Sequence, residues 1–247
     1  MIKNYLPQLL SVALLLIIWQ LFSLYLDNNS LPPPLVVLAV LKKEIISGQL
    51  PHHLGVTLLR LLVSFSIAML LGGLIGIALG LNKKLDQFFD NWLIIFLNIP
   101  ALVTIILCYM WFGLTEFAAI LAVIINKVPN VIVTIREGTK ALDQDLLEMA
   151  KCYHFGQRKT FFQVILPQLH PFIMGATRSG LALIWKIILV VELLGRSDGM
   201  GYQLHLFFQL FDVAGILAYT LAFIAVIQLI EWLILKPLDK KALRWRR

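Results

Sequence analysis

The chain has 247 residues, of which 60% are hydrophobic and 14% are charged, and its formal net charge is +7. Soluble domains have an apolar share of about 45–50%, so this composition excludes an ordinary soluble protein. The mean hydropathy of +0.85 also indicates a chain that lies in lipid.

Long apolar runs divide the sequence into membrane-spanning segments. A helix needs about 20 mostly apolar residues to cross a hydrocarbon core about 30 Å thick. The runs lack the ten-residue alternation of a membrane β-barrel, and only helices or closed barrels satisfy the backbone in lipid. The sequence therefore predicts an all-α integral membrane fold with six transmembrane helices, at about 7–26, 52–81, 88–112, 116–135, 168–193 and 213–235.

The first run follows Lys3 in the manner of a signal peptide. It is long, and no small-x-small cleavage pattern comes after it, so we expect it to remain as a membrane helix.

The distribution of Lys and Arg predicts the orientation. If both termini are cytoplasmic, only Lys42, Lys43 and Arg196 fall in outer segments. The positive-inside rule favours this arrangement. Topology then accounts for the positive net charge, and a nucleic-acid partner is not expected. Fourteen of the 21 basic residues lie on the cytoplasmic side: Lys3, Lys83, Lys84, Arg136, Lys140, Lys151, Arg158, Lys159, Lys236, Lys240, Lys241, Arg244, Arg246 and Arg247.

The cytoplasmic segment 136–168 is polar, but apolar residues recur in it at helical spacing, which predicts an amphipathic helix. A turn is expected at His154–Gln157, where Gly156 can supply unusual backbone angles. A second short helix, about 157–165, should end at Pro167, where the fifth span starts. Periodicity alone leaves open whether the first helix docks on a partner or lies on the membrane surface. Its apolar residues are Leu142, Leu146, Met149, Ala150 and Tyr153.

This segment resembles the EAA loop of ABC importer permeases, a pair of short helices that docks on the ATPase subunit. Glu148 and Pro167 are nineteen residues apart, as in the family, and Ala150 and Leu166 fit its pattern. Two positions differ from the family's pattern: Met149 replaces its first Ala, and His154 stands where the family usually has Gly. The resemblance implies that the ATPase-coupling residues are Glu148, Met149, Ala150, Tyr153, His154, Phe155, Gly156, Leu166 and Pro167.

Further segments are similar to one branch of that family, the permeases for nitrate, sulfonates, taurine, bicarbonate and thiamine precursors. They occur in the family's order from about residue 31 to the C-terminus. The pieces are Leu31-Pro32-Pro33-Pro34, His53-Leu54-Gly55-Val56-Thr57-Leu58-Leu59-Arg60, Ile99-Pro100-Ala101, Trp111-Phe112-Gly113-Leu114-Thr115-Glu116, Val191-Glu192-Leu193-Leu194-Gly195, Gly199-Met200-Gly201-Tyr202 and Trp245-Arg246.

The resemblance implies a MetI-like permease in the bacterial inner membrane. Its expected parts are a first transmembrane helix with an outer connecting segment, 1–50, and a permease core, 51–247, that contains the coupling loop 136–168. The implied partners are a second permease copy, two ATPase subunits and a periplasmic or surface-tethered solute-binding protein. The solute expected is a small anion or organic nutrient, such as a sulfonate, taurine, nitrate or a thiamine precursor.

Charged residues within the predicted spans need partners or water. Arg60 is expected to face an acidic side chain or a carbonyl, and Glu116 and Glu192 to lie near solvated outer helix ends or to take part in an outer gate. Lys186 is too deep for snorkelling, so it forms a salt bridge to another helix, is held by carbonyls, or lines the translocation path. The repeat Gly72-x-x-x-Gly76-x-x-x-Gly80 predicts close helix packing.

No catalytic chemistry is indicated, so we expect a chain that is not an enzyme and needs no cofactor or metal. The five His residues form no ligand pattern, and a disulfide between Cys108 and Cys152 is not expected in a reducing cytosol. No phosphate-binding loop is present, so ATP would be bound by another chain. Two alternatives remain: an ion-coupled secondary transporter, which would need internal repeats and broken mid-membrane helices, and a membrane enzyme, for which no nucleophile or metal constellation is seen.

Overall fold

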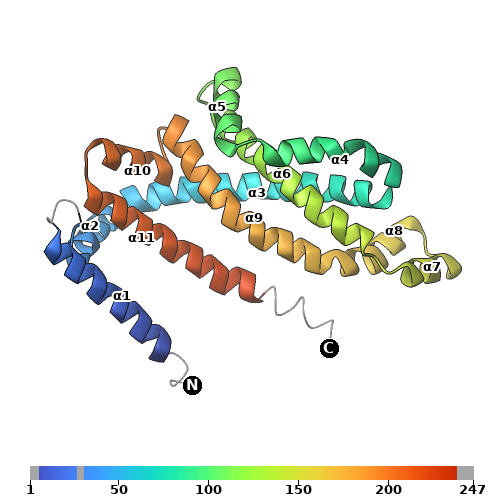
Figure 1. Ribbon diagram of the computed structural model, residues 1–247, viewed down its shortest axis with the longest axis horizontal. Helices are drawn as coiled ribbons and strands as arrows, with labels where there is room; N and C mark the ends of the chain where they lie inside the picture. The colour runs from blue at the N-terminus through green and yellow to red at the C-terminus, as the bar shows by residue number, and fades with distance from the viewer. Residues whose placement is uncertain (1–5, 27–30, 238–247) are drawn as a thin grey trace.

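A computed structural model describes residues 6–26 and 31–237, and within these residues the secondary structure is helical, without strands (Figure 1). The helices are α1 (Leu6–Tyr25), α2 (Pro34–Ile46), α3 (Gln49–Leu81), α4 (Lys83–Asn98), α5 (Ala101–Phe112), α6 (Glu116–Lys140), α7 (Gln144–Cys152), α8 (Gln157–Thr160), α9 (Leu166–Gly195), α10 (Met200–Gln209) and α11 (Val213–Ile230), with π-helical turns η2 (Phe161–Ile165) and η3 (Glu231–Leu235).

Helices α3 and α6 form the centre of the bundle and run parallel. A Cβ atom added to Gly72 would lie 2.6 Å from the Cβ of Val131, and one added to Gly80 would lie 2.4 Å from the Cβ of Thr139. Eight residues along α3 thus match eight residues along α6. The glycine repeat packs inside the same chain, because its missing side chains let the two backbones approach closely.

Helix α9 runs antiparallel to α6 and completes the core. Gly180 of α9 packs against Lys127 of α6, and Phe172 of α9 packs against Gly138 of α6. The ends of the bundle differ (Figure 1): α10 lies beside α11 and near α2 at one end, and α7 and α8 project from the other. These are called the α10 end and the α7 end below.

Not all of the six predicted membrane helices are single helices long and apolar enough to span a membrane. In the described residues, three helices (α3, α6 and α11 with its extension) are long and apolar enough to cross a membrane, and a fourth span arises if α4 and α5 are taken together. Helix α9 is not among them, and it carries Arg178, Lys186 and Glu192. Helix α1 matches the first predicted run in position but is not among them either.

The predicted third span, 88–112, is broken. Helices α4 and α5 meet at 91°, so that α5 stands away from the bundle in Figure 1. The break falls at Ile99, whose ψ of 122° is extended, and at Pro100, which precedes α5. Proline disfavours helical angles in the residue before it and has no N–H for the helix ladder, so a continuous span was the wrong prediction.

The predicted stop at Pro167 is also wrong, because α8, η2 and α9 follow one another without an interruption. The N–H of Leu166 donates to the carbonyl of Phe161, five residues earlier. This widened turn lies directly before Pro167, which occupies the first turn of α9, where its missing N–H is not needed. The second short helix is therefore the beginning of the long α9 rod.

Candidate functional site

A charge cluster at the α10 end surrounds Arg60, which lies eleven residues into α3. Its Nη1 atom is 2.8 Å from Oε1 of Glu192, and its Nε donates to Oε2 of Glu116 at 3.0 Å. Nη2 pairs with the carboxylates of Glu116 and Asp198. Arg196 also donates to Glu116, at 2.9 Å. The charge cluster, defined as Arg60, Glu116, Glu192, Arg196 and Asp198, therefore joins α3, α6, α9 and the segment before α10.

Glu192 holds the start of α10 in place. Its Oε2 accepts the backbone N–H of Gly201 at 2.9 Å, and the hydroxyl of Thr57 lies 2.9 Å from both carboxylate oxygens. The N–H of Met200 donates to that hydroxyl at 2.8 Å. First-turn N–H groups have no partner within their own helix, so a buried carboxylate and hydroxyl satisfy them here.

The position of Glu192 corrects one expectation. Its side chain is 0% exposed, so it is not solvated at an interface, whereas the Glu116 side chain is 48% exposed. Arg60 and Glu192 pair in the buried part of the cluster, and Glu116 and Asp198 pair with Arg60 on its more exposed side. The cluster therefore fits a structural joint between helices.

The sequence did not predict that Asp198 and His53 take part in this joint. Partial burial acts to raise the pKa of Asp198, but the hydrogen bond and charge of Arg60 outweigh it and hold that pKa below its usual range. His53 accepts the N–H of Gly199 at 3.0 Å. The available signal was Arg60 itself, since a buried guanidinium with five donors needs more than one acceptor.

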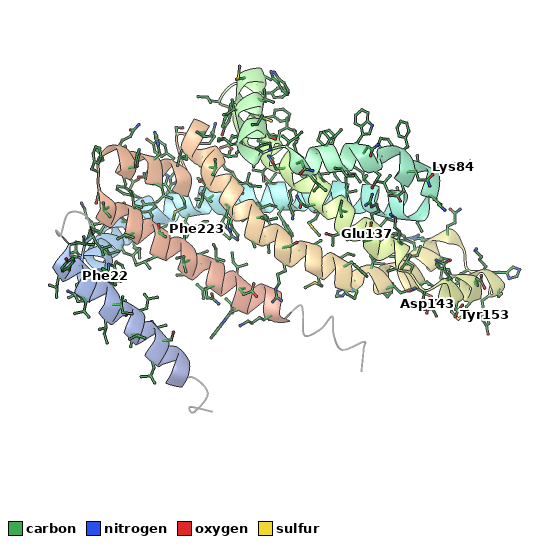
Figure 2. The ribbon with its side chains drawn as sticks, in the orientation of Figure 1. Phe22, Lys84, Glu137, Asp143, Tyr153 and Phe223 are labelled. Atoms are coloured by element: carbon green, nitrogen blue, oxygen red, sulfur yellow. The ribbon has the colours of Figure 1, made fainter. Side chains whose placement is uncertain are left out.

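Helix α7 lies at the other end of the bundle. Its N-terminus is capped by the Asp143 side chain, which accepts the N–H of Asp145 at 2.9 Å. Leu146, Met149 and Tyr153 are 39%, 40% and 73% exposed, and Figure 2 shows Tyr153 projecting at the tip of the molecule. These three side chains, the α7 face, form a partly exposed apolar stripe at spacings of three and four residues.

The residues of the predicted coupling loop differ in their exposure. Glu148 and Met149 are exposed, but Ala150 is 1% exposed and packs inside. Leu166 and Pro167 are half-buried in the first turn of α9. An exposed docking position is therefore wrong for Ala150, whose small side chain instead allows α7 to fold back on the bundle.

The turn after α7 is built on His154. This residue has φ of 55°, and Gly156 has φ of −65°, so the left-handed angle expected at Gly156 is taken by His154. The N–H of Phe155 donates to the carbonyl of Ala150, and that of His154 donates to Lys151. This is a Schellman motif, whose left-handed position is usually Gly. His154 therefore adopts the left-handed backbone angle that Gly usually provides at this position.

A cavity of about 490 Å³ separates part of α7 from the bundle. Its lining includes Lys83 and Asp86 of α4, Thr139 of α6 and Leu147 of α7. Helix α7 contacts the η2 turn.

Lys186 lies on an exposed face of α9. This α9 face consists of residues at spacings of three and four, all exposed: Gly175, Ser179, Ala182, Lys186 and Val190. Within the described chain Lys186 forms no ion pair and no side-chain hydrogen bond. The expected salt bridge to another helix of the same chain is therefore not formed among these residues.

Comparisons with known proteins agree with this architecture. Two solved structures share the fold, each with a TM-score of 0.59. An amino acid ABC transporter is 20% identical, and the match covers 83% of this chain and 96% of that chain. The inward-facing MetNI methionine ABC transporter is 16% identical, and the match covers 72% of this chain and 93% of that chain.

Among curated proteins, SsuC of Bacillus subtilis, described as an aliphatic sulfonates transport permease, is 29% identical over 96% of this chain and 87% of its own length. The taurine transport system permease TauC of Escherichia coli is 27% identical over 94% and 86%, and the nitrate import permease NrtB of Synechococcus elongatus is 24% identical over 81% and 76%.

The family model for the inner membrane component of binding-protein-dependent transport systems matches residues 50–235. That match covers most of the chain and includes the charge cluster, the α7 face and the α9 face. The chain is therefore a multi-pass membrane protein that belongs to the family of inner membrane components of binding-protein-dependent transport systems.

Proposed function

We propose that this chain is the permease subunit of an ATP-driven importer, in which two copies enclose a path for an anionic solute. The observation that carries the proposal is that one helix bundle has two exposed surfaces, the α7 face at its α7 end and the α9 face along α9. The α7 face offers a docking site for a separate ATPase, and the α9 face offers a polar lining for a path. A secondary transporter has no need of the first surface.

The α7 face fits a protein partner better than a membrane surface. Its apolar stripe is flanked by Asp145, Glu148 and Lys151, so charges of both signs surround it. A helix that binds anionic lipid usually carries an excess of basic residues on its polar face. In this proposal the α7 end is cytoplasmic, as the distribution of Lys and Arg predicts.

The α9 face provides the path. A helix side made of Gly, Ser, Ala, one Val and one Lys offers little bulk to lipid, and an exposed ammonium at that depth favours a wet surface. Two copies of the chain, with their α9 faces turned toward each other, would present two Lys186 ammonium groups to a solute. Solute would arrive from a binding protein at the α10 end.

Motion of the ATPases would be coupled to the path through one continuous helical rod. The rod from α8 through η2 to α9 joins the α7 end to the charge cluster, where Glu192 holds α10. When the ATPases close on ATP, displacement of α7 would tilt this rod and move the path between inward-open and outward-open forms. Such alternating access is a rigid-body motion and needs no internal deformation of the helices.

Replacement of Lys186 tests the path. Lys186→Met should leave the complex assembled, because no partner inside the chain is lost, and should lower uptake about tenfold for ethanesulfonate, taurine or nitrate, whichever the wild type accumulates. Lys186→Arg should restore part of the uptake, and Lys84→Met, at an exposed lysine of the α7 end, is the control. Loss of assembly in the Met variant would identify Lys186 as an interface residue, and uptake equal to wild type would remove it from the path.

A further inference from the structure

A second lysine lies deeper in the bundle than Lys186. Lys127 of α6 is 1% exposed. It is eleven residues from the start of α6 and thirteen from its end, which corresponds to about 16 Å and about 20 Å of helix. Neither end is within reach of a lysine side chain, so snorkelling does not explain it.

Lys127 has no partner in the described chain. Among the described residues it forms no hydrogen bond and no ion pair, although its side chain is buried. By contrast, Arg178 of α9, whose side chain is 51% exposed, is paired with Glu231 at 2.8 Å. An unpaired cation at membrane depth costs free energy, and such residues are retained where a function requires the charge.

The side chain of Lys127 is directed at α9. A Cβ atom added to Gly180 would lie 3.0 Å from Cε and 3.4 Å from Nζ of Lys127, and 3.3 Å from Phe65 of α3. The absence of a side chain at Gly180 thus makes the space that the ammonium end occupies. The charge rests against the backbone of α9, between three helices.

The side of α9 adjacent to Gly180 carries small side chains at this level. Ser179, the neighbour of Gly180, is exposed on the α9 face, about 100° around the helix. A helix with full side chains is about 10–12 Å across, and this face carries only small ones near Gly180. The ammonium of Lys127 therefore lies within about 10 Å of the α9 face, without touching it.

We propose that Lys127 is a specificity-determining residue of transport, which makes the path positive through α9 and so favours anionic solutes. It acts by its field and does not contact the solute. The inference rests on the proposed function, in which the path follows the α9 face. Even at the dielectric constant of water, a unit charge about 10 Å away changes the local concentration of a monovalent ion about twofold, in opposite directions for anions and cations.

The potential at the α9 face can be measured without knowing the solute. In the assembled complex in membranes, Ser179→Cys is combined with Cys152→Ser, which removes the exposed native thiol and leaves the buried Cys108. The probes are an anionic reagent, 2-sulfonatoethyl methanethiosulfonate, and a cationic one, 2-trimethylammonioethyl methanethiosulfonate. The ratio of their reaction rates reports the local potential, and the chain without Ser179→Cys supplies the blank.

Adding Lys127→Met should lower the anion-to-cation rate ratio about fourfold or more, while thermal stability is kept or raised because no partner is lost. Lys84→Met should leave the ratio unchanged. A ratio that does not respond to Lys127→Met would overturn the inference and leave the proposed path intact. If the Cys at 179 reacts with neither reagent, the α9 face is dry, and the proposed path fails together with the inference.

Discussion

At the scale of single residues, Arg60 is the centre of the α10 end. It contacts three carboxylates, one of them completely buried, so that removing its guanidinium would leave Glu192 without its cation. The sequence predicted an acidic partner for Arg60, since an arginine within an apolar run requires one. It could not predict that the partner comes from α9, because residues 132 positions apart meet only through the packing of α3 on α9.

Arg60→Met should destabilise the protein by about 3–5 kcal/mol, because it leaves a buried charge unpaired. The measurement is thermal unfolding of the purified chain in detergent. Adding Glu192→Gln to this variant should recover part of the loss, and Glu137→Gln, in an ion pair whose carboxylate is 50% exposed, should change stability by less than about 1 kcal/mol. If Arg60→Met unfolds like the wild type, the charge cluster is not a structural joint.

His154 gives a second prediction at this scale. A left-handed backbone costs a non-glycine residue about 1 kcal/mol, so His154→Gly should stabilise the turn after α7 by about 0.5–1 kcal/mol. The hydrogen bond between its Nδ1 and the carbonyl of Cys152, at 2.9 Å, offsets part of this gain. Slower hydrogen exchange of the amides of His154 and Phe155 would support the account, and faster exchange would contradict it. Gly156→Ala is the control and should have little effect.

At the scale of elements, the long periodic helices were predictable and their interruptions were not. Helices α3, α6 and α11 lie within a few residues of the predicted runs. The 91° break between α4 and α5 and the continuous η2–α9 rod both involve prolines, and a proline can break a helix or begin one. Which happens depends on whether neighbouring helices can satisfy the backbone, and local sequence does not contain that information.

The glycine repeat of α3 allows a sharp comparison within one helix. A Cβ atom at Gly76 would lie 2.9 Å from the Cβ of Ile135, whereas a Cβ atom at Gly73 would meet nothing within 4 Å. Gly76→Ala should therefore destabilise the chain by about 1–3 kcal/mol through forced separation of α3 and α6. Gly73→Ala should be neutral or slightly stabilising, since Ala favours helix more than Gly does. The measurement is thermal unfolding of the two variants. Equal changes in stability for Gly76→Ala and Gly73→Ala would contradict the parallel α3–α6 contact.

At the scale of the whole molecule, the fold separates its free surfaces. The charge cluster fixes α10 at one end, the α7 face lies at the other, and α9, which carries the α9 face, runs between them (Figure 1). The sequence predicts a coupling loop by its resemblance to a family motif, but it does not predict which residues of that segment are exposed. Ala150 lies four residues after Leu146 and three before Tyr153, so helical spacing alone also places it beside the α7 face. Its burial against the bundle is what distinguishes it from the exposed residues.

The most direct test of the central claim is the ATP hydrolysis that accompanies the tagged chain when it is purified from its native membranes. With the wild type we expect a vanadate-sensitive ATPase activity, since this chain contains no phosphate-binding loop of its own. The double variant Met149→Asp/Tyr153→Asp places two charges on the exposed α7 face without touching the buried Ala150. It should remain folded and monodisperse but lose at least about nine-tenths of that activity. An undiminished vanadate-sensitive activity in the folded double variant would contradict the assignment of α7 as the element that couples this permease to its ATPase.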